Sequence, residues 1–297
     1  MEDSSMGARV PEWAGTYPFR PDEKRPALLT EWRMPRLYGI APHQVPTCLY
    51  ASTDRITSSG FRVRSGQWFE PADIHGGTEV YYVKSGEATA IDPDTGRTFV
   101  VPSGSVAYIP EKMWHQTHNF AMEDLDVITF FAPKMWVDEI GVEGSYEKEP
   151  RTFSGSESDE QYPAPLDAAF VLSGSGDGVV GRYPCSAESA LRSRHIFAVS
   201  EHGALRLVHG RNSRALVSLF VSNEVMSVGT ILVPSGTVTE REVHGGDEVL
   251  CVLAGSLSVV LLSDDSSTKS VSVPRFEVQS GERFLIPEGF AHSYYNS

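Results

Sequence analysis

The sequence predicts an all-β protein built from two tandem copies of one small barrel or sandwich. The first observation is a repeat: HGGTEVYYVKSG, starting at His75, and HGGDEVLCVLAG, starting at His244, are identical at seven of twelve positions. The second is that the apolar runs are short, rich in Val, Ile, Tyr and Phe, and separated by turn residues such as PSG and DPDTG. Many short strands joined by glycine-rich turns are typical of a sandwich or small barrel.

The repeat extends on both sides of this motif. STDRITSSGFRVRSG (52–66) parallels SNEVMSVGTILVPSG (222–236). GSVAYIPEKMWHQTHN (104–119) parallels GERFLIPEGFAHSYYN (281–296). Duplication of one domain is the simplest explanation, because self-similarity at a fixed separation is the mark of repeated structural units.

These parallels predict a domain order. We expect an N-terminal arm (1–30), a first domain (31–140), a linker with short irregular or helical pieces (141–195) and a second domain (196–297). The stretch 144–165 is polar and rich in Gly, Ser and Pro, as an exposed linker would be. The chain stops one residue after Asn296, which leaves no room for a final strand in the second copy. A strand from the arm or the linker could close that barrel.

The composition argues against several classes of partner. The chain has 297 residues, of which 39 are acidic and 25 basic, and its formal net charge is −14. An acidic surface repels phosphate backbones and anionic membranes, so we expect neither a nucleic-acid nor a membrane partner. The cysteines (Cys48, Cys185 and Cys251) are far apart and the N-terminus has no apolar signal core. We therefore expect a cytoplasmic protein without disulfides.

Each copy places chemically active side chains in the same pattern. Alternate residues of a strand face the same side, so Asp73 and His75 point one way, as do Glu242 and His244. The Gly-Gly pair that follows each histidine permits a bend that brings the next glutamate back toward it. A further histidine comes from a later strand. Each copy can thus gather two histidines and two carboxylates: Asp73, His75, Glu79 and His115, and Glu242, His244, Glu248 and His292.

Such a set indicates a metal site. Imidazole and carboxylate at these spacings suit a divalent first-row metal. Two histidines and one carboxylate with open positions form the arrangement of non-haem Fe(II) oxygenases, while hard oxygen ligands also suit Mn(II) or Zn(II). No cysteine belongs to the set, which argues against a structural zinc finger. His118 is expected to face away from the set, because it lies an odd number of residues after His115 in a strand.

These motifs resemble those of the cupin superfamily, G(X)5HXH(X)3–4E(X)6G and G(X)5PXG(X)2H(X)3N. His75-(X)3-Glu79-(X)6-Gly86 and the same spacing from His244 match the latter part of the first motif. Residues 281–296 match the second motif in full, and residues 104–119 match it except that Lys112 replaces a glycine. The resemblance implies a bicupin, with two tandem double-stranded β-helix (jelly-roll) barrels that use His75, Glu79, His115, His244, Glu248 and His292 as metal ligands.

The chain departs from the family pattern at one position in each copy. Asp73 and Glu242 replace the first histidine of HXH. These carboxylates are candidate ligands or catalytic acid–base groups. The Glu-X-His start of the second copy is similar to that of the ureidoglycine aminohydrolase family of manganese bicupins. That family uses His and Gln where this chain has Glu248 and His292, so the similarity is partial.

Three classes of function follow. The favoured one is an Fe(II) dioxygenase that acts on a small-molecule metabolite, with Asp73, Glu242 and Tyr81 as candidate catalytic residues. Tyr81 is included because strand alternation puts it on the same face as Glu79. The second is a redox-neutral Mn(II) or Zn(II) isomerase, cyclase or aminohydrolase. The third is a non-catalytic metal- or ligand-binding bicupin. The resemblance also implies a homo-oligomer, a dimer or higher.

Overall fold

The structure is a computed structural model that describes residues 13–30, 36–38, 45–69, 72–133, 135, 181–212, 214–262 and 274–297. The predicted exposed linker at 144–165 lies outside these residues. Strands dominate the described chain, which confirms the predicted all-β class. None of the described helices is both long and apolar enough to cross a bilayer. The domain boundaries stay predictions.

The first barrel pairs a large sheet with a small one. The large sheet has the strand order β11-β8-β5-β10-β4-β3-β2 and the small sheet the order β7-β6-β9. Alternating apolar residues from both sheets, such as Phe61, Val83 and Val101, fill the space between them. The strands are β2 (Arg36–Tyr38), β3 (Pro46–Ser52), β4 (Thr57–Val63), β5 (Thr78–Ser85), β6 (Glu87–Ile91), β7 (Thr98–Pro102), β8 (Val106–Ile109), β9 (Gln116–His118), β10 (Leu125–Ala132) and β11 (Phe197–Val199).

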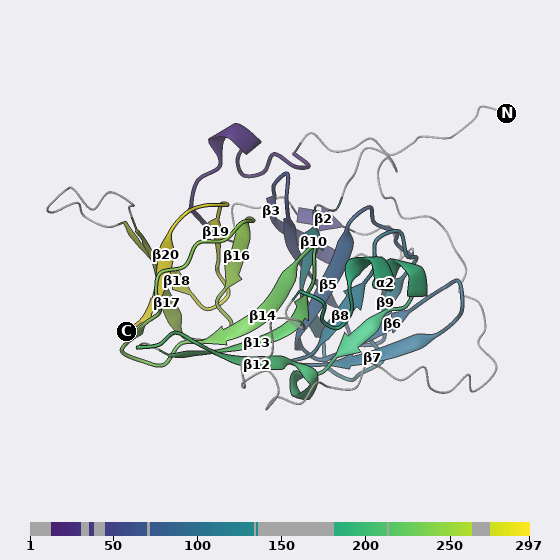
Figure 1. The fold of residues 1–297 in the computed structure, drawn as a ribbon. Coiled ribbons are helices and arrows are strands. Elements are labelled where there is room, and N and C mark those ends of the chain that lie inside the picture. Colours follow the sequence, from purple (N-terminus) through teal and green to yellow (C-terminus); the bar gives the residue numbers. More distant parts are fainter. Residues whose placement is uncertain are drawn as a thin grey trace, which may run out of the picture.

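The second barrel repeats this plan with three sheets, β1-β19-β16, β12-β13-β14 and β15-β20-β17-β18. Its core contains Val259, Phe284 and Ile286. Figure 1 shows this barrel, mostly in green, olive and yellow, beside the blue strands of the first. Its strands are β1 (Ala27–Leu29), β12 (Leu205–His209), β13 (Ala215–Ser222), β14 (Ser227–Leu232), β15 (Thr237–Val238), β16 (Glu248–Cys251), β17 (Ser256–Leu261), β18 (Arg275–Gln279), β19 (Arg283–Ile286) and β20 (His292–Asn296).

The two barrels exchange strands. β1 from the N-terminal arm pairs with β19 of the second barrel. In the same way β11, which follows the short helix α2 (Ala187–Ser193), pairs with β8 of the first barrel. The sequence suggested that the arm or the linker could supply the strand that closes the second barrel. β1 does join that barrel, but on β19, where β11 joins the first barrel on β8, so it does not take the place that β10 has between β4 and β5. The remaining helical pieces are two short 3-10 turns, η1 (Pro21–Glu23) and η5 (Glu201–Gly203).

One place in the duplicated sheet differs between the barrels. In the first barrel β10 lies between β4 and β5 and pairs with both. In the second barrel the corresponding strands are β14 and β16, and no strand of the described chain pairs with either of their facing edges. β14 is accordingly exposed, with Leu232 at 64%, whereas β4 is largely buried. Among the described strands, β10 therefore has no counterpart in the second barrel.

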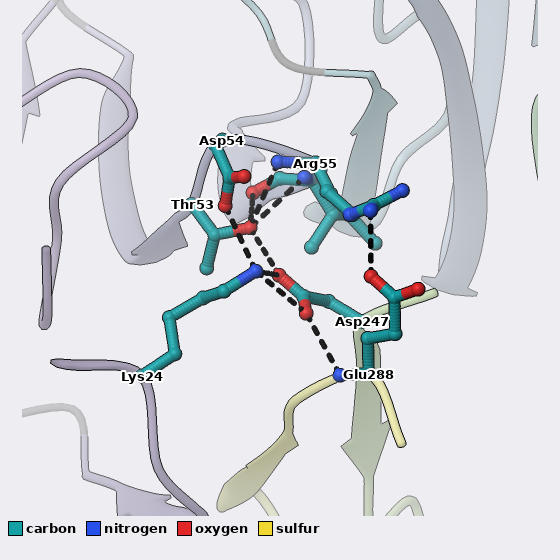
Figure 2. A network of polar contacts seen from close by, with 7 residues as sticks. Lys24, Thr53, Asp54, Arg55, Asp247 and Glu288 are labelled. Carbon is teal, nitrogen blue, oxygen red and sulfur yellow. Dashed lines mark hydrogen bonds and ion pairs between the residues drawn. The ribbon is translucent and has the colours of Figure 1, made fainter. Parts of the chain in front are cut away.

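A polar network ties the arm to both barrels, as Figure 2 shows. Lys24 in the arm forms ion pairs with Asp54 of the first barrel at 2.9 Å and with Asp247 of the second at 3.0 Å. Thr53 Oγ1 also donates to Asp247, at 2.7 Å. A second ion pair, Arg55 with Glu288 at 2.6 Å, runs beside it. Asp247 therefore joins three parts of the chain.

Lys112 occupies a backbone position that favours glycine. Its φ is 59°, in the left-handed region, and Gly289 at the equivalent place has a φ of 81°. Each donates its N–H to the carbonyl of the motif histidine, His75 or His244. A side chain in this conformation costs roughly 1–2 kcal/mol. We expect Lys112→Gly to raise the free energy of unfolding by about 1 kcal/mol, after the entropy that glycine adds to the unfolded chain.

Urea denaturation tests this prediction. The unfolding midpoint of Lys112→Gly should lie at a higher urea concentration than that of the wild type, with the same dependence of the free energy on urea. Gly289→Ala is the matched variant of opposite sign and should lower the midpoint. A lower midpoint for Lys112→Gly would contradict the assignment of strain to Lys112.

Candidate metal centres

Backbone pairing assembles both clusters in the same way. In the first barrel Asp73 and His115 exchange two backbone hydrogen bonds, of 2.7 and 2.9 Å. In the second, Glu242 and His292 do the same at 2.9 and 3.0 Å. This bridge sets the first carboxylate beside the later histidine. The Gly-Gly bend then returns the chain so that the motif glutamate begins the next strand on the same face, as the sequence predicted.

The first centre brings three predicted ligands into direct contact. Glu79 Oε2 lies 2.9 Å from His115 Nε2 and 3.4 Å from His75 Nε2. The other oxygen of Glu79 accepts a 2.8 Å hydrogen bond from Thr129 Oγ1 on β10. Ligand atoms of Asp73, His75 and His115 lie within 4.8 Å of one another. All four predicted residues therefore surround one point.

Burial controls the charge of the first centre. His75, Glu79 and His115 are each at most 5% exposed. Burial lowers the pKa of His75 well below its usual value, and a positive charge on His115 would lower it further. Burial raises the pKa of Asp73 to about 7. A neutral imidazole is the form that binds a metal.

The second centre has the same plan with more ion pairs. Glu248 Oε2 lies 3.2 Å from His244 Nε2 and 3.3 Å from His292 Nε2. Glu242 Oε2 lies 3.4 Å from His244 Nε2, and its other oxygen lies 3.0 Å from His209 Nε2. Ligand atoms of Glu242, His244 and His292 lie within 4.8 Å of one another. His209, on β12, belongs to no motif of the repeat.

A backbone carbonyl orients the later histidine in each centre. His115 Nδ1 lies 3.0 Å from the carbonyl of Met113, and His292 Nδ1 lies 3.0 Å from the carbonyl of Phe290. A carbonyl only accepts, so Nδ1 carries the proton and Nε2 presents its lone pair to the cluster. Metal-binding histidines are held in this way by an outer hydrogen bond.

The donor sets fit a divalent metal. Buried atoms of the clusters have no hydrogen-bond partner: Glu79 Oε2 and His115 Nε2 in the first centre, and Glu242 Oε1 and Glu248 Oε2 in the second. A buried polar atom without a hydrogen bond costs about 1–3 kcal/mol, so these atoms are suited to bind a cation. Two imidazoles and two carboxylates would supply both the charge and the ligand number.

Tyr294 extends the second centre. Its hydroxyl donates a short hydrogen bond to Glu248 Oε1 and lies 3.2 Å from His292 Nε2. Burial, together with the charge of Glu248, raises the pKa of Tyr294 well above its usual value. Tyr294 therefore stays protonated at neutral pH. No position of the repeated motifs marks it in the sequence.

Proton affinities in the second centre predict a pH profile for the metal-free protein. The adjacent carboxylates of Glu242 and Glu248 raise the pKa of His244 from 6.5 to about 10. Burial opposes ionisation of Glu248, but the close contacts with His244, His292 and Tyr294 lower its pKa from 4.5 to about 2. The contribution of His244 to the free energy of unfolding is complete below pH 6.5 and is lost as the pH rises toward 10. The contribution of Glu248 is complete above pH 4.5 and is lost as the pH falls toward 2.

We therefore expect the stability difference between the metal-free wild type and His244→Ala to be largest between about pH 4.5 and 6.5. Thermal unfolding in chelator across this range measures it. A difference that does not change with pH would contradict the ion-pair assignment.

The two centres differ in access. The first borders a small cavity of about 40 Å³, lined by Phe61, Phe69 and Phe131 among others, which has room for a few water molecules. In the second, the side chain of His244 is 47% exposed and that of Glu248 is 27% exposed, although His292 is fully buried. The edges of β14 and β16 that have no partner among the described strands belong to this barrel.

Two other predicted residues fall at different places. Tyr81 shares the interior face with Glu79, as predicted, and lines the small cavity of the first centre, where its ring lies edge-to-face with those of His115 and Phe61. It is 4% exposed. Burial raises its pKa well above the usual value, and the charge of Glu79 adds to this. His118 lies outside the cluster, where its ring stacks on Trp68.

Comparisons with known proteins agree with this fold. Residues 61–131 match the family model of the cupin domain. No curated protein sequence matches the chain significantly. A serine-to-alanine mutant of oxalate decarboxylase from Bacillus subtilis superposes with a TM-score of 0.57 and 14% identity, covering 91% of this chain and 73% of that one. A tryptophan-to-phenylalanine form of the same enzyme gives 0.57 and 12% with the same coverage.

A third solved structure is the protein Ylba from E. coli, with a TM-score of 0.52 and 14% identity, over 92% of this chain and 86% of that one. At such identities the likeness concerns the fold. Residues 61–131 thus match the cupin domain, and the chain shares its two-barrel fold with these solved structures.

Proposed function

We propose that the chain is a divalent-metal enzyme that carries out a redox-neutral proton transfer on a small molecule at the second centre. The supporting observation is that two histidines and two carboxylates, Glu242 and Glu248, meet in a cluster that opens to solvent. Two hard oxygen ligands beside two imidazoles suit Mn(II) or Zn(II). Such a metal, when bound, supplies Lewis acidity that polarises a carbonyl or amide group.

Glu242 is suited to move the proton. Its Oε1 is buried without a hydrogen bond and lies 3.0 Å from His209 Nε2, while its Oε2 faces His244. A carboxylate in this position accepts a proton from a bound substrate, and His209, whose side chain is 36% exposed, passes it to solvent. Tyr294 holds Glu248 in one orientation, which keeps that carboxylate ionised.

The first centre fits a different role. Its ligands are buried and the adjoining cavity is small, so a metal there would be closed to substrate. We propose that it stabilises the first barrel, as structural metal sites with closed coordination do. The first centre would then stabilise the fold, and the second would carry out the reaction.

The Fe(II) dioxygenase predicted from the sequence is the second candidate. The trio Glu242, His244 and His292, within 4.8 Å, matches the two-histidine, one-carboxylate arrangement of such enzymes. The additional carboxylate of Glu248 favours the redox-neutral reaction over it, because an oxygenase needs open positions for both substrate and O₂.

Reconstitution separates the two candidates. The full chain, purified without a histidine tag, is stripped and reloaded with Mn(II), Zn(II) or Fe(II), then screened by proton NMR against small carbonyl and amide compounds with and without O₂. We expect turnover with Mn(II) or Zn(II) in the absence of O₂. Turnover only with Fe(II), accompanied by O₂ uptake, would replace the proposal with a dioxygenase. If the chain bound none of these metals, both candidate functions would be wrong.

Glu242→Gln tests the proton transfer itself. We expect it to lower kcat by at least about 100-fold, the usual contribution of a positioned acid–base group, while some metal remains bound through the other three ligands. The control is Glu277→Gln, because Glu277 forms an exposed pair with Arg275 on β18. An unchanged kcat in metal-loaded Glu242→Gln would contradict its role.

A further inference from the structure

A second cavity lies between the barrels, away from both metal centres. Its volume is about 310 Å³, and its walls come from β3, β4 and β10 of the first barrel and from β16, β19 and their flanking turns in the second. The residues used below are Cys48, Tyr50, Gly60, Arg62, Lys84, Asp126, Cys251, Glu282 and Arg283. None of them is a candidate metal ligand.

Arg283 crosses this interface from the second barrel. The residue is 4% exposed, and its Nη1 donates to Ser58 Oγ at 2.6 Å and to the Ser59 carbonyl at 2.8 Å. Its guanidinium lies 3.5 Å over the ring of Tyr50. Gly60 leaves space for it, since a Cβ there would come within 2.9 Å of Nη2. Arg283 is one of the residues that line the cavity.

Arg283 has no carboxylate as an ion-pair partner among the residues that the structure describes. The other two cations of the lining, Arg62 and Lys84, share Asp126, at 3.4 and 3.5 Å. Glu282 accepts instead from the backbone N–H of Gln279, at 2.8 Å. A buried charge is normally paired, because its desolvation costs several kcal/mol.

The duplication provides an internal control. Arg283 pairs with Cys251 across β19 and β16. At the equivalent places in the first barrel, Val106 pairs with Tyr82, and Val106 is fully buried against the other barrel. The position equivalent to Arg283 is therefore occupied by an apolar residue in the first barrel. In the second barrel a buried arginine stands in place of the valine and adds a positive charge. A small cysteine stands in place of the tyrosine and leaves space for the cavity.

We propose that this inter-barrel cavity binds a small organic carboxylate, whose oxygens accept hydrogen bonds from Arg283. A guanidinium offers paired, planar donors that match a carboxylate. The ring of Tyr50 and the side chains of Cys48 and Cys251 give an apolar wall for the carbon body, which an inorganic anion would not use. The volume is at the lower end of the roughly 300–1,000 Å³ typical of small-molecule sites.

Isothermal titration calorimetry of the full chain tests the site, with benzoate and succinate as probes and inorganic phosphate as a comparison at matched ionic strength. We expect a carboxylate probe to bind wild type and Arg275→Gln, an exposed control on β18, with equal affinity. Arg283→Gln should bind at least about tenfold more weakly, the effect of one lost charge-assisted hydrogen bond. Cys251→Tyr, which restores the residue of the first barrel, should also block binding while Arg283 remains.

Three outcomes would overturn the proposal. One is that neither probe binds wild type, or that only phosphate does. Another is equal binding by wild type, Arg283→Gln and Cys251→Tyr. The last is binding that survives Arg283→Gln but disappears in His292→Ala, which would place the carboxylate at the second metal centre.

Discussion

Replacing His292 with alanine is expected to empty the second centre of metal and to abolish turnover. His292 is fully buried, and its Nε2 lies 3.3 Å from Glu248 and 3.2 Å from the hydroxyl of Tyr294. Loss of an outer-shell partner alone typically lowers metal affinity about 10–100-fold. Loss of the imidazole itself removes a ligand, so we expect an affinity decrease at the upper end of that range or beyond it.

Metal analysis by ICP-MS on untagged protein, with activity assayed in parallel, measures both effects. His115→Ala is the matched variant, because His115 holds the same position in the first barrel and makes the same Nδ1 contact to a carbonyl. We expect it to lose one metal per chain but to keep turnover at the second centre. If His115→Ala abolished turnover while His292→Ala left it intact, the working centre would be the first one.

The ligand clusters were predictable from the sequence because they depend on local rules. Strand alternation fixes which side Asp73 and His75 share, and the Gly-Gly bend fixes the return of Glu79. The unexpected Lys112 was visible as well, since the motif calls for glycine there and the backbone is left-handed. The sequence also assigned His118 to a place outside the cluster, where it stacks on Trp68.

Features that depend on contacts between distant segments could not be predicted in this way. His209 reaches Glu242 from β12, outside every motif. β11 joins the first barrel although it lies beyond α2, because its partner edge on β8 is set by the packing of the two barrels. The different exposure of the two centres accompanies the presence of β10 beside β5 and the lack of a counterpart beside β16 among the described strands. The order of residues along one strand does not show which distant strand will pair with it.

The contacts of the fourth residue of the repeated motif also could not be predicted from the sequence. We expect its replacement in the second copy to lower the stability of the protein strongly. This residue is Thr78 in the first copy and Asp247 in the second. The side chain of Asp247 is fully buried and accepts from Lys24 Nζ, from Thr53 Oγ1 at 2.7 Å and from the backbone N–H of Glu288 at 3.0 Å (Figure 2). The side chain of Lys24 is itself only 12% exposed. The carboxylate thus satisfies three donors from the arm and both barrels.

Asp247→Ala would leave the buried Lys24 ammonium with only Asp54 as an ionic partner and Thr53 without its acceptor. Removing one member of a buried ion pair costs about 3–5 kcal/mol, because the other charge stays desolvated. We expect the melting temperature to fall by on the order of 10 °C and the arm to become accessible to trypsin at Lys24. Glu188→Ala, which breaks the exposed pair with Arg192 on α2, should cost less than about 1 kcal/mol. If the two variants melted together and the arm stayed protected, the network would not be what fastens the arm to the barrels.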